Sequence, residues 1–157
     1  MSFEIAPQSG ALGAFVTGLD LSEPLDDENF QRVRKAFIDH HVLCFLDQKL
    51  SPAQQLDFAA RWGRVWIHPY VASIDGHPGI MEIGDPHEIT VHWHSDTTHS
   101  AEPPRLSILL ARRVPATGGD TQWANQHAAY EALSSGMREL LDGLRALHSG
   151  TERAGDA

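Results

Sequence analysis

Two short apolar runs on either side of a helical pattern constrain the fold of this chain more than any other feature. Ala14–Val16 and Val42–Leu46 have the length and the branched or aromatic composition that are typical of strands. Between them, Phe30, Val33 and Phe37 recur at helical spacing, which predicts a helix with one buried stripe. Strands mixed with helices in this order predict an α+β fold, with helices packed on a sheet or on a partial barrel.

The rest of the chain continues this mixture. Ser51 can cap a helix, Pro52 suits its first position and Gln54 completes a capping box, so a second helix is predicted here, ending near Gly63. We also predict strands at Gly79–Ile83, Val91–Asp96 and Leu106–Val114, a helix from Gln126 to Ala132 capped by Asn125, and a last helix with Met137, Leu140, Leu141 and Leu144 on one face.

Composition excludes several classes of protein. The 157 residues suffice for one domain, and 21 acidic against 12 basic residues give a net charge of -9, which argues against nucleic acid and anionic membranes as partners. The single cysteine, Cys44, excludes a disulfide within the chain and is expected to be a buried core residue. With no signal peptide and no membrane-length apolar run, we expect a cytoplasmic protein.

His94-Ser95-Asp96 is the sharpest chemical feature. In a strand, residues i and i+2 project from one face, so His94 and Asp96 can converge on one ion. Two histidines and one carboxylate with open positions form the ligand set of non-haem iron(II) oxygenases. The motif alone is weak evidence, because ten histidines and 21 acidic residues give roughly one such match by chance.

A third ligand does not follow from the local sequence. In a straight strand, His92 and Asp96 would lie about 13 Å apart, which is too far for ligands of one metal unless the chain bends sharply. His99 can fold back from a loop, although nothing in the sequence requires it. The cluster of histidines between His87 and His99 also leaves open a tetrahedral zinc module.

Several separate motifs resemble the taurine dioxygenase (TauD/TfdA) family, in the order in which that family has them. They are Trp93–Thr98, Pro103–Pro104, Gly118–Trp123 and Ala128–Leu133, preceded by Gly18–Leu21, His41–Phe45, Ser51–Pro52 and Ile67–Pro69. The resemblance covers nearly the whole chain but only the first half of a family member. It implies that residues 1–150 are the amino-terminal part of one such domain, and we expect 151–157 to be a disordered tail or a truncation point.

The resemblance implies a partial double-stranded β-helix, or jelly-roll, core with flanking helices. It implies an Fe(II)- and 2-oxoglutarate-dependent dioxygenase that uses O2 to hydroxylate a small acidic organic substrate. By position, His94 and Asp96 resemble the first two iron ligands, Thr121 the threonine that binds the 2-oxoglutarate carboxylate, and His68 a histidine that contacts the acidic group of the substrate. The carboxylate of Asp96 favours hydroxylation over halogenation. We expect the protein to form a homo-oligomer.

The sequence departs from taurine dioxygenase at Val71, Thr90 and His99, where that enzyme has tyrosine, asparagine and an aromatic residue. Sulfonates other than taurine, alkyl sulfates and carboxylates are therefore equally open as substrates. The family's distal histidine ligand and its 2-oxoglutarate-pairing arginine have no counterpart after His148. A catalytically incomplete chain, which needs a missing half or a partner chain, is thus the alternative to an active enzyme.

Overall fold

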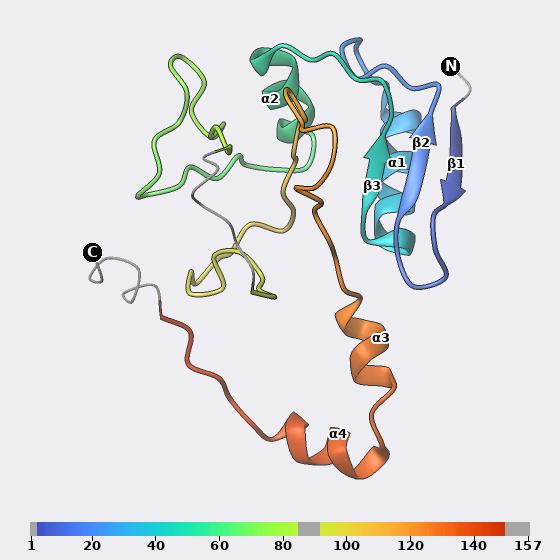
Figure 1. Ribbon diagram of the computed structural model, residues 1–157, viewed down its shortest axis with the longest axis vertical. Coiled ribbons are helices and arrows are strands. Elements are labelled where there is room, and N and C mark those ends of the chain that lie inside the picture. Colours follow the sequence, from blue (N-terminus) through green and yellow to red (C-terminus); the bar gives the residue numbers. More distant parts are fainter. Residues whose placement is uncertain (1–2, 85–91, 150–157) are drawn as a thin grey trace. The chain divides into compact units, whose positions relative to one another are not determined.

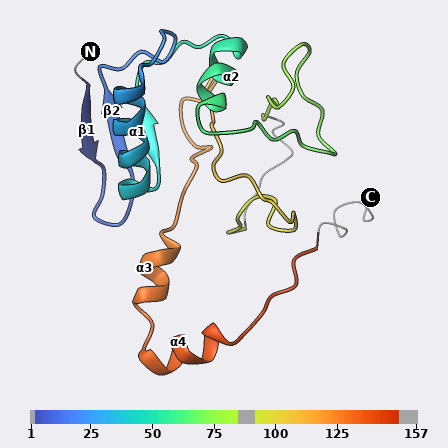
Figure 2. The same cartoon turned by 180° about the vertical axis from the view of Figure 1, so that it is seen from behind.

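A parallel pair of strands joined by a helix organises the amino-terminal part of the computed structural model, which describes residues 3–84 and 92–149 (Figure 1). Strand β2 (Ala14–Thr17) leads into helix α1 (Asp27–His40), which returns to strand β3 (Leu43–Phe45). Strand β1 (Glu4–Pro7) pairs antiparallel with β2, and β3 pairs parallel with it, so the order is β1-β2-β3. Figures 1 and 2, taken from opposite sides, show α1 against one face of this sheet.

Helix α1 forms where the sequence predicts it because both of its ends are satisfied. Asp26 caps the start by accepting a hydrogen bond from the Asn29 backbone N–H at 2.8 Å, and acidic residues in the first turn complement the helix dipole. At the other end His41 adopts a left-handed conformation (φ 65°), and its N–H bonds to the Phe37 carbonyl. The buried stripe is confirmed, since Val33 is fully buried and Phe30 nearly so.

Helix α2 (Pro52–Ala60) confirms the predicted capping box. The Ser51 hydroxyl accepts from the Gln54 backbone N–H, and the Gln54 side chain accepts from the Ser51 N–H at 2.8 Å. Beyond its end, the Trp62 ring meets Phe30 and Phe37 edge-on, with ring centroids 5.2 and 5.3 Å apart. These aromatic contacts join α2 to α1 and extend the core.

Two further helices also form. Helix α3 (Gln126–Glu131) starts at the predicted cap, because Asn125 Oδ1 accepts from the Ala128 N–H at 3.0 Å. Helix α4 (Ser135–Asp142) carries the predicted apolar stripe, which lies exposed. None of the helices in the described part of the chain combines the length and apolar character required to cross a bilayer.

Three predicted strands are wrong over the described residues. Segments 79–83, 92–96 and 106–114 form no β-ladder, and the start of the second, Val91, lies outside the described residues. In 106–110, burial still alternates, with Leu106 and Leu110 half-buried and Leu109 64% exposed. The period-two pattern of a strand is present, but a ladder also needs a neighbouring strand to supply hydrogen bonds.

The prediction that Cys44 and its strand are buried is also wrong. Strand β3 alternates between half-buried and exposed residues, and Cys44 is exposed. The reason is the sheet order, which among the described residues leaves β3 at an edge beside β2. Its apolar composition alone could not distinguish an edge from a central strand.

The described residues divide into two compact units. The first contains 3–65 and 115–134, and the second contains 66–84, 92–114 and 135–149. The division of the chain at residue 150 stays a prediction, and the tail 151–157 lies outside the described residues.

Candidate functional site

His94 and Asp96 converge without a strand. Nε2 of His94 lies 3.0 Å from Oδ1 of Asp96, in an irregular segment of the second unit. The turn that follows is closed by a hydrogen bond from the Ser100 N–H to the Thr97 carbonyl. The two side chains keep 49% and 66% of their surface exposed, so the facing atoms are accessible to an ion.

Nδ1 of His94, the ring nitrogen that faces away from Asp96, makes a contact that orients the imidazole. Nδ1 of His94 lies 2.8 Å from the His92 carbonyl oxygen, which can only accept, so Nδ1 carries the proton. Nε2 faces the Asp96 carboxylate, so the 3.0 Å separation suits either a proton or a cation between the two atoms. A backbone carbonyl that orients a histidine in this way is one of the common outer contacts of a metal-binding imidazole.

The separation of the two atoms fits one shared ion. Donor atoms that each lie about 2.1 Å from a metal, at about 90° in an octahedral shell, are about 3 Å from each other. Within the described residues, no third His, Cys, Asp or Glu side chain joins His94 and Asp96. The His92 carbonyl oxygen contacts the His94 ring, and His87 lies outside the described residues.

Thr97, which sequence reasoning did not single out, directly follows the carboxylate. It is a β-branched residue in the left-handed region (φ 53°), and its buried hydroxyl has no hydrogen-bond partner among the described residues. Such a conformation costs energy and often occurs at functional sites. Next to it, the Thr98 hydroxyl lies 2.8 Å from Nδ1 of His148. No pattern in the sequence signals either feature.

His68 lies in the same unit as His94, in a loop. Its Nδ1 accepts hydrogen bonds from the backbone N–H groups of Tyr70 at 3.1 Å and Val71 at 2.9 Å. Because Nδ1 accepts, Nε2 of the neutral ring carries the proton and is a donor. An N–H donor is the group that would recognise a sulfonate, sulfate or carboxylate oxygen.

Thr121 lies exposed in the first unit, whereas His94 and Asp96 belong to the second. Gly118 and Gly119 precede it in left-handed conformations (φ 78° and 72°), which glycine adopts without strain. Four residues after it, Asn125 caps α3. Thr121 thus lies on a short irregular link between two left-handed glycines and a helix start.

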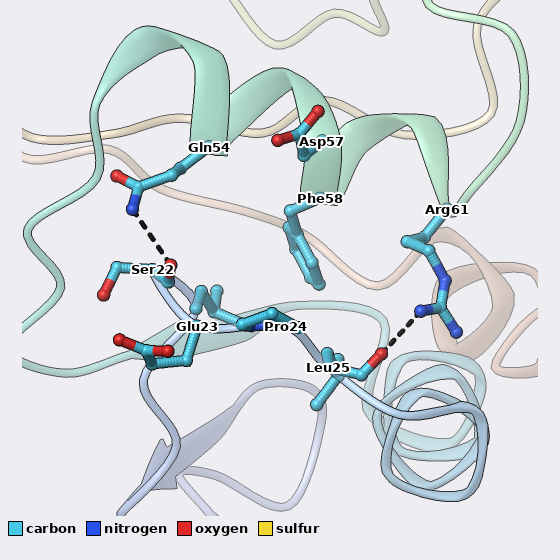
Figure 3. A pocket seen from close by; sticks show the side chains of 9 residues that line it. Ser22, Glu23, Pro24, Leu25, Gln54, Asp57, Phe58 and Arg61 are labelled. Carbon is cyan, nitrogen blue, oxygen red and sulfur yellow. Dashed lines mark hydrogen bonds between the residues drawn. The ribbon is translucent and has the colours of Figure 1, made fainter.

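A cleft of about 270 Å³ in the first unit contains none of the predicted site residues (Figure 3). It lies between α2 and the segment 21–25, and the Gln54 side chain closes one end by donating to the Ser22 carbonyl at 2.9 Å. Arg61 donates to the Leu25 carbonyl at 2.6 Å at the other end. These polar groups hold α2 against the loop that precedes α1.

Comparison with known proteins gives one consistent family. The family model described as "Taurine catabolism dioxygenase TauD, TfdA family" matches residues 4–156. An alpha-ketoglutarate-dependent sulfate ester dioxygenase of Pseudomonas putida is 36% identical over 151 residues, which are 95% of this chain and 50% of the relative. An alkylsulfatase of Acinetobacter baylyi is 36% identical, over 90% of this chain and 45% of the relative.

Solved structures agree. A taurine dioxygenase from Burkholderia xenovorans superposes with a TM-score of 0.78 at 33% identity, covering 91% of this chain and 52% of that one. The family match spans far more than half of the residues, so this chain belongs to the TauD/TfdA family of dioxygenases. The chain spans about half the length of the curated relatives that it matches.

Proposed function

We propose that this chain forms the amino-terminal part of an Fe(II)- and 2-oxoglutarate-dependent dioxygenase with a jelly-roll core, and that it supplies the first two iron ligands. The observation that carries the proposal is the His94–Asp96 pair, with facing donor atoms 3.0 Å apart and the imidazole oriented by a backbone carbonyl. Family membership adds independent support, because the relatives are dioxygenases of this cosubstrate.

The residues fit the metal that the family implies. An imidazole nitrogen and a carboxylate oxygen are two of the three protein ligands in the two-histidine, one-carboxylate set of non-haem iron(II) oxygenases. When bound, Fe(II) supplies the redox chemistry that couples O2 reduction to oxidative decarboxylation of 2-oxoglutarate and to hydroxylation of the substrate. The protein provides positions: His94 and Asp96 for the metal and Thr121 for the cosubstrate carboxylate.

The proposed substrate is a small organic acid. The relatives are named for sulfate esters, alkyl sulfates and (S)-phenoxypropionate, all of which yield anions. In this chain, the Nε2–H donor of His68 is suited to such an acidic oxygen. A hydroxylated carbon that bears a sulfate or an ether oxygen is unstable and releases the oxygen substituent, so substrate loss and aldehyde or ketone formation report turnover.

The test measures succinate formation with Fe(II), ascorbate, O2 and 2-oxoglutarate, in the presence of an alkyl sulfate, an alkyl sulfonate or a phenoxy acid. The complete gene product that contains this chain should form succinate and consume one of these substrates, and the Asp96→Ala variant should not. The 157-residue chain alone should show little turnover, since no third ligand joins the pair within its described part. Tight tetrahedral zinc binding with no response to 2-oxoglutarate would contradict the proposal.

A further inference from the structure

Asn125 uses both ends of its side-chain amide, and only one of them is needed to cap α3. Oδ1 accepts from the Ala128 N–H at 3.0 Å, which is the cap. Nδ2 donates to the Ala11 carbonyl oxygen at 2.6 Å, across 114 positions of sequence. Both residues belong to the first unit, so this second bond ties the start of α3 to the loop between β1 and β2.

The loop that receives this bond is held firmly. The Ser9 hydroxyl donates to the Leu12 carbonyl at 2.6 Å and accepts from the Leu12 N–H at 3.2 Å. The Gln8 N–H bonds to the Gly13 carbonyl at 2.8 Å, which closes the hairpin. The Ala11 carbonyl is therefore presented from an ordered turn and can serve as a fixed anchor for Asn125.

A second contact holds the same helix. The His127 ring stacks on His41, with ring centroids 5.5 Å apart and planes 24° from parallel. His41 is itself fixed as the left-handed cap of α1. Helix α3 is thus attached to the amino-terminal sheet and to α1 at two places, one at its cap and one in its first turn.

We propose that Asn125 is a positioning residue for 2-oxoglutarate, because its bond to Ala11 fixes the link that carries Thr121. On one side of Thr121 the chain is set by the left-handed turn at Gly118–Gly119, and on the other by the Asn125 anchor four residues later. This inference rests on the proposed function, since the position of Thr121 matters for catalysis only if the protein binds 2-oxoglutarate.

Two substitutions separate the anchor from the cap. Asn125→Asp keeps an acceptor for the Ala128 N–H but replaces the donor that faces Ala11 with an oxygen. Asn125→Ser also keeps a good capping group and is too short to reach Ala11, without adding charge. Gln126→Glu is the matched control, because it adds the same charge as Asn125→Asp one position further along on an exposed side chain.

In the complete gene product, both Asn125 variants should raise the KM for 2-oxoglutarate by about three- to tenfold, the scale of one lost hydrogen bond, with kcat nearly unchanged. Gln126→Glu should leave both constants unchanged. A lower Tm with an unchanged KM would overturn the proposal, because the bond would then serve stability alone.

Backbone ¹⁵N relaxation gives a readout that does not depend on activity. The amides of residues 120–124 should have lower order parameters in Asn125→Asp and Asn125→Ser than in the wild type, and equal order parameters would overturn the anchor. An absence of succinate formation by the wild type contradicts the proposed function instead, so the two failures are distinguishable.

Discussion

Nε2 of His94 lies 3.0 Å from Oδ1 of Asp96, and the chain between them is held by local contacts rather than by a sheet. The His92 carbonyl orients the imidazole, so the pair is arranged before any ion binds. A prearranged pair needs little further ordering to accept a metal, which lowers the entropic cost of binding.

Removal of either proposed ligand should abolish this advantage. In the complete gene product, His94→Ala and Asp96→Ala should each weaken Fe(II) or Co(II) binding by more than about 100-fold, beyond the effect typical of outer contacts. Anaerobic titration followed by Co(II) absorption measures this. His77→Ala is the matched control, because its Nδ1 also lies near a carbonyl two residues earlier, that of Asp75 at 3.0 Å. Equal losses in all three variants would contradict the assigned site.

The described structure shows which parts of the fold follow from local sequence. Helices α1 and α2 were predictable because Asp26, Ser51 and Gln54 satisfy helix ends through neighbours three residues away. Segment 106–114 was wrongly predicted as a strand, because a ladder requires a partner strand and local sequence does not reveal whether one lies beside it. Strand β1 was missed, since its four residues include Pro7 and show no alternating apolar pattern.

The candidate site also has features that local sequence predicted and features that it could not predict. His94 and Asp96 are near neighbours, and their i, i+2 spacing correctly predicted that the side chains meet, although they lie in an irregular segment rather than in a strand. The bonds Asn125–Ala11 and His148–Thr98 join residues 114 and 50 positions apart, so no local pattern could reveal them. The roles of His94 and Asp96 as iron ligands stay predictions, as do those of Thr121 and His68.

Thr97 gives a prediction about stability. Its hydroxyl is buried without a partner among the described residues, which costs about 1–3 kcal/mol of desolvation. Thr97→Val keeps the shape and the branching, so the left-handed strain is unchanged while the orphan hydroxyl is removed. The free energy of unfolding of the complete gene product should rise by about 1 kcal/mol in urea titrations. A decrease would show that a group outside the described residues accepts from this hydroxyl.

Asp26 gives a prediction about pH. Hydrogen bonds from the Asn29 backbone N–H, and then from its side-chain amide, lower the pKa of Asp26 below its ordinary value of 3.8. A lowered folded-state pKa means that the stabilisation is fully present above pH 3.8 and is lost as the pH falls through the folded value. Asp26→Ala should therefore be less stable than the wild type at pH 7, and the difference should shrink below pH 3.8.

Urea unfolding of both proteins between pH 7 and pH 3 measures this difference. Asp57→Asn is the control for the loss of one negative charge from an exposed position. A difference between Asp26→Ala and the wild type that stays constant over this pH range would show that the cap acts without its charge.

The exposed apolar stripe of helix α4 should determine how the 157-residue chain behaves by itself. Met137, Leu140 and Leu141 are 44%, 61% and 40% exposed, and Leu144 just beyond the helix is 63% exposed. Burial of one leucine contributes about 1.5–3 kcal/mol, so an uncovered stripe of this size favours association with any apolar surface. The isolated chain should therefore bind a hydrophobic dye and scatter light as oligomers or aggregates.

The double variant Leu140→Gln, Leu144→Gln should lower both signals, because it removes apolar surface without emptying a core position. Glu139→Gln is the matched control, as it changes a polar residue of the same helix and leaves the stripe intact. If the unmodified chain is instead a monodisperse monomer that melts cooperatively and binds no dye, the stripe is covered within this chain in solution. If the double variant still binds the dye, the apolar surface responsible lies elsewhere, for example in segment 106–110, where half-buried and exposed residues alternate.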